Sequence, residues 1–394
     1  MEGSRPYDLV LFGATGFTGG LTADYLAAHG PATMRWAIAG RNRSKLDAVA
    51  ARLAAAAPEA PKPDIIVADA ADREALRQAA ESTRVVITTI GPYALHGGPL
   101  VAACAAAGAD YVDLTGEPEF VDRVWVDHHA EAEKSGARIV HCCGFDSIPH
   151  DLGAYFTVQQ LPEGVPLKVN GYARSNARFS GGTYHSAING FARARQTLAA
   201  AKERRRLEQR PAGREVHAAP ARIHHDGSLG GWTVPLPTID GVIIRRSAAG
   251  LDRYGPDFTY GHHMVAKHLA TVGAIAGGVG TVGLLAQLPP TRKLLLKMKA
   301  PGEGPDEAQR ERSWFKVTFV GEGGGKRVVT EVSGGDPGYG ETSKMLAESG
   351  LCLAFDELPE RSGQLTPAVA MGDALLARLQ KVGIEFRVLE SSGA

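Results

Sequence analysis

The glycine spacing near the start of the chain indicates a phosphate-binding loop. An apolar run, Asp8 to Phe12, leads directly into the loop and the start of a helix, which comprise Gly13, Thr15, Gly16, Phe17, Thr18 and Gly19. Glycine permits a tight turn after a buried strand, lets the backbone approach phosphate oxygens and lets a helix pack closely on a strand. Free N–H groups and the helix dipole then hold the anion. A glycine triplet alone can be a structural turn, but between an apolar strand and a helix it favours a nucleotide pyrophosphate site.

A basic segment follows the second apolar run and has the sequence Gly40-Arg41-Asn42-Arg43-Ser44-Lys45. A protein that binds NAD places a carboxylate here to accept hydrogen bonds from the ribose hydroxyls, whereas a guanidinium can hold a phosphate with two parallel hydrogen bonds. We therefore predict NADP as the cofactor, with Arg41 as the main contact to its 2′-phosphate and with Asn42 and Lys45 beside it. Arg43 or Lys45 can share this role, and a solvated basic helix start is the structural alternative.

Two further loops are expected to touch the cofactor. Asp69 follows the third predicted strand, where it lies near the adenine or caps the following helix. Gly91, Pro92 and Tyr93 open the loop after the fourth strand, a rigid connection at the height of the nicotinamide. Tyr93 stacks on the nicotinamide ring or donates a proton in one interpretation, and only closes the turn in the other.

Polar residues after the fifth and sixth predicted strands converge on the same edge of the sheet. They lie in Asp113-Leu-Thr-Gly-Glu117 and in Gly144-Phe-Asp-Ser-Ile-Pro-His-Asp-Leu-Gly153, which includes Asp146 and Ser147. These side chains are candidates for the substrate site, although Asp146 and Asp151 are explained equally well as helix caps.

The elements that position these residues follow from the alternation of apolar strands with helices along the first half of the chain. Six strands are predicted, at 8–12, 34–39, 64–67, 85–89, 111–113 and 138–141. Such alternation is typical of a doubly wound parallel sheet, and right-handed crossovers give the strand order 3-2-1-4-5-6 with the cofactor across the carboxyl edge. The predicted fold class is therefore α/β, a Rossmann-type parallel sheet with a second α+β domain.

The predicted domain boundaries lie where this alternation ends. Residues 1–155 form the NADP-binding Rossmann domain, and residues 156–336 form an α+β substrate domain. Within the second domain, strands are expected at 167–174, 314–320 and 327–332, with a hairpin turn at Gly323 to Gly325. A long helix is expected from Ser180 to about Arg206. Residues 337–394 carry helices at 338–353 and 367–381 that can pack back on the Rossmann domain.

Composition limits the classes of partner. The chain of 394 residues has 43 Lys and Arg against 43 Asp and Glu, so its formal net charge is zero and nucleic acid is not expected as a partner. The basic run Lys202 to Arg206 is interpreted as a solvated helix end. The first residues carry no apolar signal region, which predicts a cytoplasmic nucleotide site, and peripheral attachment to the membrane stays open through the segment from Leu269 to Leu288.

No metal site is expected from the histidines or cysteines. The pairs His224-His225 and His262-His263 are sequence neighbours whose side chains point apart, and no nearby cysteine completes a ligand set. The four cysteines are expected to be reduced and buried. Tyr260 and His262 are instead candidates for polar residues that face the substrate.

The motifs GATGFTG, AGRN, GPYALHGGPLV, YVDLTGE and GFDSIPHDLG occur in this order, with LTPAVAMGDALL near the end. In these motifs the chain resembles the saccharopine dehydrogenase-like oxidoreductases, and most of all the actinobacterial trans-acting enoyl reductases, over essentially its whole length. The resemblance implies NADP binding at Gly13, Gly16, Gly19 and Arg41. For the named subgroup it implies reduction of a carbon–carbon double bond in a lipid or polyketide chain made by another enzyme. It supplies no catalytic residue. The cationic set that saccharopine dehydrogenase itself needs is not assignable here, which disfavours an amino-acid substrate.

One stretch without charged residues, Leu269 to Leu288, lies inside the second domain and precedes Pro289-Pro290 and several basic residues. Its length suffices to span a bilayer, yet it is glycine-rich and only mildly hydrophobic. A buried or acyl-channel helix pair is the preferred interpretation. Insertion into a membrane or lipid surface, aided by the basic flank, is the second, and a transmembrane span is the third. The first two suit an oily substrate.

The predicted reaction is the NADPH-dependent reduction of an α,β-unsaturated acyl group, with a hydride added at the β-carbon and a proton at the α-carbon. Tyr93 is the predicted proton donor, since a tyrosine near its ordinary pKa is protonated at neutral pH, and Asp146 or Ser147 orients the carbonyl. The alternatives are a saccharopine-type amino-acid or imine dehydrogenase and a non-catalytic NADP-binding protein at a lipid surface. The exact substrate stays open, as does the oligomeric state, for which a homodimer is one candidate.

Overall fold

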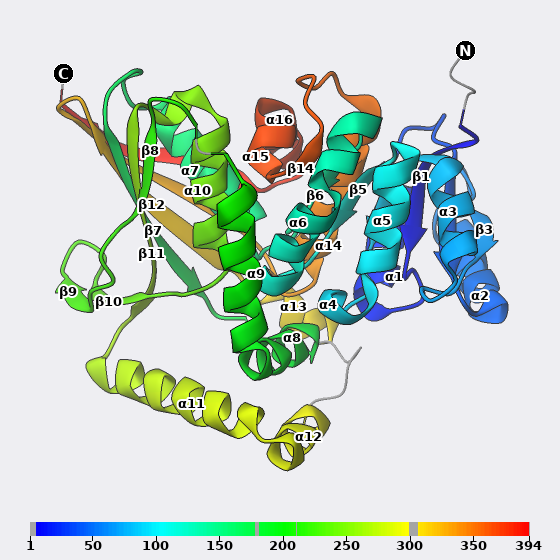
Figure 1. The fold of residues 1–394 in the computed structure, drawn as a ribbon, viewed down its shortest axis with the longest axis horizontal. Helices are drawn as coiled ribbons and strands as arrows, with labels where there is room; N and C mark the ends of the chain where they lie inside the picture. The colour runs from blue at the N-terminus through cyan, green and yellow to red at the C-terminus, as the bar shows by residue number, and fades with distance from the viewer. Residues whose placement is uncertain (1–4, 178–180, 210, 299–305, 394) are drawn as a thin grey trace.

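Two β-sheets and the helices around them make up the fold. The computed structural model describes residues 5–177, 181–209, 211–298 and 306–393. The parallel sheet and the second, mixed sheet lie beside each other, with helix α7, Ile148–Gln159, leading from the first to the second (Figure 1).

The first sheet has seven parallel strands in the order β14-β6-β5-β4-β1-β2-β3. Its strands are β1 Tyr7–Phe12, β2 Trp36–Gly40, β3 Asp64–Val67, β4 Thr83–Thr88, β5 Asp110–Asp113, β6 Arg138–Val140 and β14 Gly363–Leu365. The predicted Rossmann-type order 3-2-1-4-5-6 is confirmed. The added seventh strand, β14, pairs with β6 and comes from the far end of the chain. It was not predicted, because β14 lies outside the strand–helix alternation of the first half and its partner strand is more than 200 residues away in the sequence.

Helices cover both faces of this sheet. They are α1 Phe17–His29, α2 Arg43–Ala56, α3 Arg73–Glu81, α4 Tyr93–His96, α5 Gly98–Ala107, α6 Pro118–Ser135 and α14 Gly340–Phe355. Successive residues of β1 point to opposite faces, so that Leu9 and Leu11 pack with α1, α2 and α14, while Val10 and Phe12 pack with α3, α5 and α6. A strand buried on both sides requires an unbroken apolar run, which is why β1 shows no alternation with polar residues.

The second sheet has eight strands, in the order β15-β13-β12-β7-β11-β10-β9, with β8 paired to β11. Its strands are β7 Leu167–Ser175, β8 Glu215–Ala218, β9 His224–Asp226, β10 Gly231–Pro235, β11 Asp257–Ala266, β12 Phe315–Gly323, β13 Lys326–Gly334 and β15 Glu385–Ser392. The predicted hairpin at Gly323 to Gly325 is present, since β12 and β13 pair antiparallel up to Gly323 and Lys326. Helix α7 packs against β7, β12 and β13.

The remaining helices are α8 Gly181–Ala192, α9 Ala194–Leu207, α10 Asp240–Gly250, α11 Leu269–Gln287, α12 Pro289–Lys297, α13 Glu307–Glu311, α15 Pro367–Ala370 and α16 Gly372–Lys381. The single helix predicted up to Arg206 is therefore two helices that separate at Arg193, and Ser180 lies outside the described residues. The interpretation of the basic run as solvated is wrong for Arg204, which is buried and pairs with Asp122 at 2.5 Å where α9 packs on α6.

The carboxyl-terminal segment contacts both sheets. Helix α14 packs on α1, β4 and β5, and β14 extends the parallel sheet. The last strand, β15, then pairs with β13 at the edge of the second sheet. The chain therefore returns to the first sheet and crosses again to the second, so that one hydrophobic core includes residues of both sheets.

Helix α11 differs from the interpretation preferred for its sequence. Leu269 to Gln287 is one continuous helix rather than a pair of helices. Only 12% of its most apolar stretch of 18 residues is buried, so the expected burial is wrong. It contacts mainly α8 and α12, and Figure 1 shows α11 and α12 lying below the two sheets. Four of its glycines, at 273, 277, 278 and 280, would give a Cβ no neighbour within 4 Å, so the helix has little side-chain volume with which to pack.

Gly19→Ala is expected to lower the free energy of unfolding by about 1–3 kcal/mol, because the added Cβ would lie 2.0 Å from the carbonyl oxygen of Gly13. Gly20→Ala is the matched control in the same helix turn, since its Cβ would have no contact closer than 3.7 Å. That change should leave stability unchanged or raise it by up to about 1 kcal/mol. Denaturant titration followed by circular dichroism measures both variants, and an equal loss in the two would contradict this packing.

Candidate functional site

The glycine loop joins β1 to α1 at the carboxyl edge of the parallel sheet. Gly13 has φ +90°, a conformation that favours glycine, and a Cβ there would lie 2.5 Å from Oγ1 of Thr89. Gly16 is the cap residue of α1, so the first N–H groups of the helix receive no side-chain cap from the described residues. Thr15 and Gly16 are exposed. These open N–H groups at a helix start fit a pyrophosphate.

The carboxyl-terminal segment supports the same loop. The ring of Phe17 packs edge-on against Tyr339, with ring centroids 4.8 Å apart, and the guanidinium of Arg310 lies 5.6 Å from the Phe17 centroid. The hydroxyl of Ser343 donates a hydrogen bond to the carbonyl of Thr18 at 3.3 Å. The start of α1 is therefore held from outside the first half of the chain.

The basic segment after β2 leaves Arg41 free. Its guanidinium is exposed and has no hydrogen bond or ion pair within the part of the chain that the structure describes. Arg43, by contrast, pairs with Asp47 at 3.0 Å, and the Asn42 side chain caps α2 by accepting from the Lys45 N–H at 3.0 Å. Of the two arginines, Arg41 is the one available to a phosphate. The amino group of Lys45 is exposed nearby.

Asp69 lies just after β3 and is exposed. Its carboxylate accepts a hydrogen bond from the Ala71 N–H at 2.9 Å, which closes a turn. The cap of α3 is Asp72, which accepts from the N–H groups of Glu74 and Ala75 at 3.1 Å each. Asp69 is therefore not the helix cap, and its carboxylate is accessible at the sheet edge.

Tyr93 is buried beneath the loop in which it was expected to contact the nicotinamide. Its hydroxyl donates to the carbonyl of Thr88 at 3.2 Å and accepts from the Leu114 N–H at 3.2 Å, and its ring packs against Phe120. Burial, together with the charge of Asp113, holds the pKa of Tyr93 well above its ordinary value. Both hydrogen bonds of the hydroxyl are used to connect β4 to the loop after β5. Because its proton is already donated to Thr88, this placement disfavours Tyr93 as a proton donor to the substrate.

Glu117 organises the loop that starts at Gly91 and Pro92. Its two carboxylate oxygens accept from the N–H groups of Tyr93 and Ala94, at 3.0 Å each, and so cap the short helix α4. A cavity of about 260 Å³ lies beside this loop. It is lined by Pro92, Ala94, Leu95, Glu117, Asn189, Ala192, Arg193 and Arg292. The cavity is thus formed between α4 and the helices α8 and α12.

Two acidic residues of the predicted convergence are structural. Asp113 is fully buried and accepts from the hydroxyl of Tyr111 and the N–H groups of Thr115 and Cys142, while His141 lies 2.7 Å from the same carboxylate. Asp151 accepts from the hydroxyl of Ser247 at 2.6 Å and the Ala368 N–H at 2.9 Å. Both carboxylates use their oxygens to hold neighbouring segments in place.

Asp146 is the acidic residue that differs. Its side chain is partly exposed, and within the described ranges no hydrogen bond or ion pair reaches it. It lies against the loop after β5, since a Cβ on Gly116 would be 2.9 Å from Oδ2 of Asp146. Burial and the nearby charge of Asp240 raise the pKa of Asp146 to about 7. A carboxyl with such a pKa can hold or release a proton at neutral pH.

Asp240, at the start of α10, is the centre of a polar cluster that lies near Asp146 and includes residues from the second half of the chain. Although burial opposes its ionisation, His150 and His262 hold the pKa of Asp240 below its ordinary value. The polar side chains around its carboxylate are Ser147 at 3.4 Å, His150 at 3.3 Å, His262 at 3.5 Å and the hydroxyl of Thr238. Tyr260 donates to or accepts from Nδ1 of His262 at 3.1 Å.

This cluster combines three predicted residues with others, such as Asp240, that sequence reasoning missed. Ser147, predicted to orient a carbonyl, is fully buried and points to Asp240, and Tyr260 and His262 are turned into the same cluster. His150 was visible in the motif GFDSIPHDLG, but Asp240 stands in the short sequence Thr-Ile-Asp-Gly, which carries no recognisable signal. Only the tertiary fold places Asp240 beside α7.

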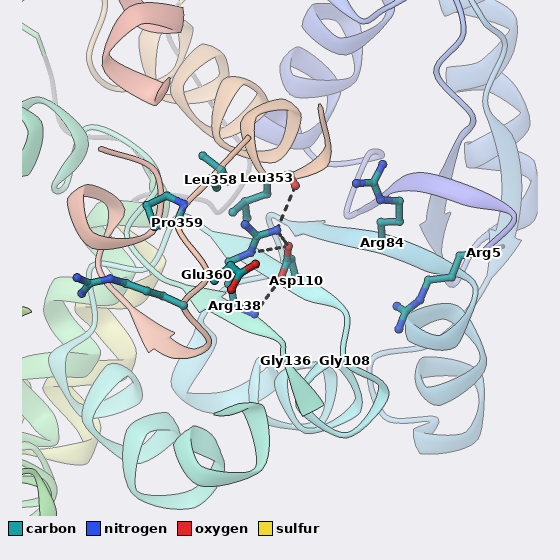
Figure 2. A pocket seen from close by; sticks show the side chains of 11 residues that line it. Arg5, Arg84, Gly108, Asp110, Gly136, Arg138, Leu353, Leu358, Pro359 and Glu360 are labelled. Atoms are coloured by element: carbon teal, nitrogen blue, oxygen red, sulfur yellow. Dashed lines mark hydrogen bonds and ion pairs between the residues drawn. The ribbon is translucent and has the colours of Figure 1, made fainter. Parts of the chain in front are cut away.

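The opposite, amino edge of the sheet also carries a cavity, of about 370 Å³ (Figure 2). It is rich in arginine, but Arg138 forms an ion pair with Asp110 at 2.5 Å, and Arg5 donates to three backbone carbonyls. Arg361 donates to the carbonyl of Gly250 at 2.8 Å. These guanidinium groups hold the edge together, and the cavity lies away from the dinucleotide loop.

Across the described ranges, no group of three or more His, Cys, Asp or Glu side chains is arranged to hold a metal ion. His224 interacts with the hydroxyl of Thr233, and the ring of His225 packs on Trp232. The four cysteines are buried and free.

Comparison with known proteins agrees with the geometry. Residues 9–140 match the family described as the saccharopine dehydrogenase NADP binding domain. The glycines, the open start of α1 and the free guanidinium of Arg41 are what such a cofactor requires. Saccharopine dehydrogenase (L-Glu forming) of Saccharomyces cerevisiae has a similar fold, with a TM-score of 0.55 and 14% identity over 98% of this chain and 100% of that one.

Relatives extend over nearly the full length of the chain. A Mycobacterium tuberculosis protein is 40% identical over 97% of each chain. The trans-acting enoyl reductases of Mycobacterium ulcerans and Mycobacterium tuberculosis are each 37% identical over 96% of this chain and 97% of theirs. The chain therefore belongs to the saccharopine dehydrogenase-like, NADP-binding oxidoreductases and, within them, to the family of the trans-acting enoyl reductases.

Proposed function

We propose that this protein is an NADPH-dependent enoyl reductase whose substrate is a hydrophobic acyl chain, of lipid or polyketide type, made by another enzyme. The names of its relatives support this reaction and substrate class. The structural observation that carries the proposal is the carboxyl of Asp146, which has no partner among the residues that the structure describes and lies at the same sheet edge as the dinucleotide loop.

Positively polarised groups of this chain bind the cofactor phosphates, and a carboxyl group supplies the proton. The open N–H groups at the start of α1 bind the pyrophosphate, and Arg41 binds the 2′-phosphate. NADPH, when bound across this edge, supplies the hydride for the β-carbon. Asp146 holds a proton at neutral pH and donates it to the α-carbon of the acyl group. The buried, ionised Asp240 keeps that proton on Asp146, because two neighbouring carboxylates resist sharing negative charge.

The cavity beside the Pro92 loop offers space for the acyl chain. Its volume of about 260 Å³ is lined in part by the apolar side chains of Pro92, Ala94 and Leu95. The other half of the lining is polar, from Glu117, Asn189, Arg193 and Arg292, so an apolar wall faces charged groups that can orient a polar head of the substrate. Glu117 borders the cavity and accepts hydrogen bonds from the N–H groups of Tyr93 and Ala94, which holds the lining loop in position.

Arg41→Ala is expected to raise the KM for NADPH by roughly 10- to 150-fold, because a charge-assisted hydrogen bond to a phosphate is lost. The KM for NADH should stay within about twofold. Arg43→Ala is the matched control, since Arg43 is already paired with Asp47. Steady-state kinetics with both cofactors measures the change, and an equal effect of the two substitutions would refute the assignment to Arg41.

Asp146→Asn is expected to lower kcat by roughly 100- to 10,000-fold with unchanged NADPH affinity, because the amide cannot donate the proton. Tyr93→Phe keeps the buried ring and should keep kcat within a few-fold, with a loss of stability of about 1 kcal/mol. Turnover of a short enoyl thioester, followed by NADPH absorbance, compares the two variants. Loss of turnover in Tyr93→Phe alone would restore Tyr93 as the donor.

The value of kcat/KM is expected to fall as pH rises through about 7, because Asp146 loses its proton there. Asp240→Asn should move this alkaline limb to lower pH, since the negative charge that disfavours ionisation of Asp146 is removed. A pH profile of kcat/KM for both proteins tests the pair. A wild-type profile without an alkaline limb between pH 6 and 8 would exclude Asp146 as the titrating donor.

A further inference from the structure

Helices α11 and α12 form a surface of exposed apolar side chains. The fifteen large hydrophobic side chains that are exposed in the described ranges include seven within residues 269–298. They are Leu269, Val279, Leu284, Leu285, Leu288, Leu294 and Met298, with Leu284 75% and Met298 72% exposed. A concentration of this kind on thirty residues marks a surface that binds something. We name this segment the α11–α12 arm.

The arm is packed against α8 near its middle, and the start of α11 follows β11 directly and also contacts β10 and β11. Ile188 and Tyr184 of α8 form a small cluster with Ala286 and Leu295, which fixes the junction of α11 and α12. The hydroxyl of Tyr184 donates to the carbonyl of Leu295 at 3.1 Å. The arm therefore has a defined position, and α11 lies below the two sheets with most of its apolar stretch unburied (Figure 1).

The connections of the arm favour a position on a bilayer over a span across it. Helix α11 is the helix of the described chain that is long and apolar enough to cross a membrane. Its preceding strand, β11, and the next strand after the arm, β12, both pair with β7 in one sheet. A helix that crossed once would leave its two ends on opposite sides, whereas the sheet requires both on the same side. The arm can bury its apolar side chains at an interface without this conflict.

The charge of the arm selects the kind of surface. Between Asp257 and Glu303 the sequence has no acidic residue, while Lys267, Arg292, Lys293 and Lys297 are basic. Lys267 precedes α11 and the other three lie on α12, so cations stand at both ends of the apolar helix. Apolar side chains with flanking cations match a bilayer that presents anionic headgroups.

The arm is also continuous with the candidate substrate cavity. Arg292 of α12 and Asn189 and Ala192 of α8 line the same cavity as Pro92 and Leu95. An acyl chain held at the lipid surface would therefore reach the cavity beside α12. We propose that the α11–α12 arm docks this protein on an anionic lipid bilayer and that the acyl substrate reaches the cavity from that surface. The second half of this statement rests on the proposed function, whereas the docking does not.

Flotation of the full-length protein with vesicles tests the docking. Vesicles of phosphatidylcholine with phosphatidylglycerol are compared with vesicles of phosphatidylcholine alone. We expect binding to the anionic vesicles, reduced at least about tenfold by the triple change Leu284→Asp, Leu288→Asp and Leu294→Asp. Leu198→Asp is the matched control, since Leu198 is 69% exposed on α9 and outside the arm, and it should bind as the wild type does.

A second pair of substitutions isolates the electrostatic part. Lys293→Glu with Lys297→Glu reverses two exposed charges that do not line the cavity, and should reduce binding to anionic vesicles by about tenfold or more. NADPH fluorescence and turnover of a short, water-soluble enoyl thioester should be unchanged in all variants. Because flotation needs no turnover, a protein that binds vesicles but lacks enoyl reductase activity would overturn the proposed function and leave the docking intact.

Three results would overturn the docking. One is a wild-type protein that stays unbound with both kinds of vesicle. Another is a triple variant that floats as well as the wild type. The third is a homodimer in light scattering that the triple variant converts to monomer without any vesicle binding by the wild type, which would show that a second copy covers the arm.

Discussion

Helix α1 can reach the turn after β1 only because residue 19 has no side chain. The Cβ of any other residue would lie 2.0 Å from the Gly13 carbonyl oxygen, closer than atoms can approach. This contact places the start of α1 directly above the end of β1, where its free N–H groups face the carboxyl edge of the sheet. The dinucleotide site, the loops around it and the carboxyl-terminal segment that supports Phe17 all depend on that placement.

The proposed chemistry depends on a second constraint, which joins the two halves of the chain. Asp146 belongs to the loop before α7, whereas Asp240 begins α10 in the second half. Asp240 is held ionised by its histidine and hydroxyl neighbours, and its charge adds to burial in raising the pKa of Asp146. The protonation of the candidate donor is therefore a property of the assembled fold rather than of the motif that contains it.

The sequence predicted the parallel sheet well because its strands are buried on both faces. Six continuous apolar runs alternate with helix periods, and each run marks where the next strand begins. Arg41 was selected for a similar reason, because a contact to the 2′-phosphate is expected from its position after β2, and that contact stays a prediction. Local pattern could not predict β14, which is three residues long and pairs across a separation of more than 200 residues. It also could not show that the Tyr93 hydroxyl is occupied, because its partners Thr88 and Leu114 are placed by tertiary contacts.

The misjudged helix α11 shows how the same sequence feature has different meanings in different surroundings. An uncharged stretch of this length is buried when other apolar surfaces surround it, and its sequence alone does not record whether they do. Here α8 and α12 meet α11 near its carboxyl end, and among the glycines of the remainder Leu269 and Val279 stay exposed rather than packed in a core. An apolar surface that the protein does not cover itself is costly in water, and it persists where a partner covers it. In the proposed docking, the basic residues beside this surface attract an anionic bilayer, and the surface is then buried on binding rather than on folding.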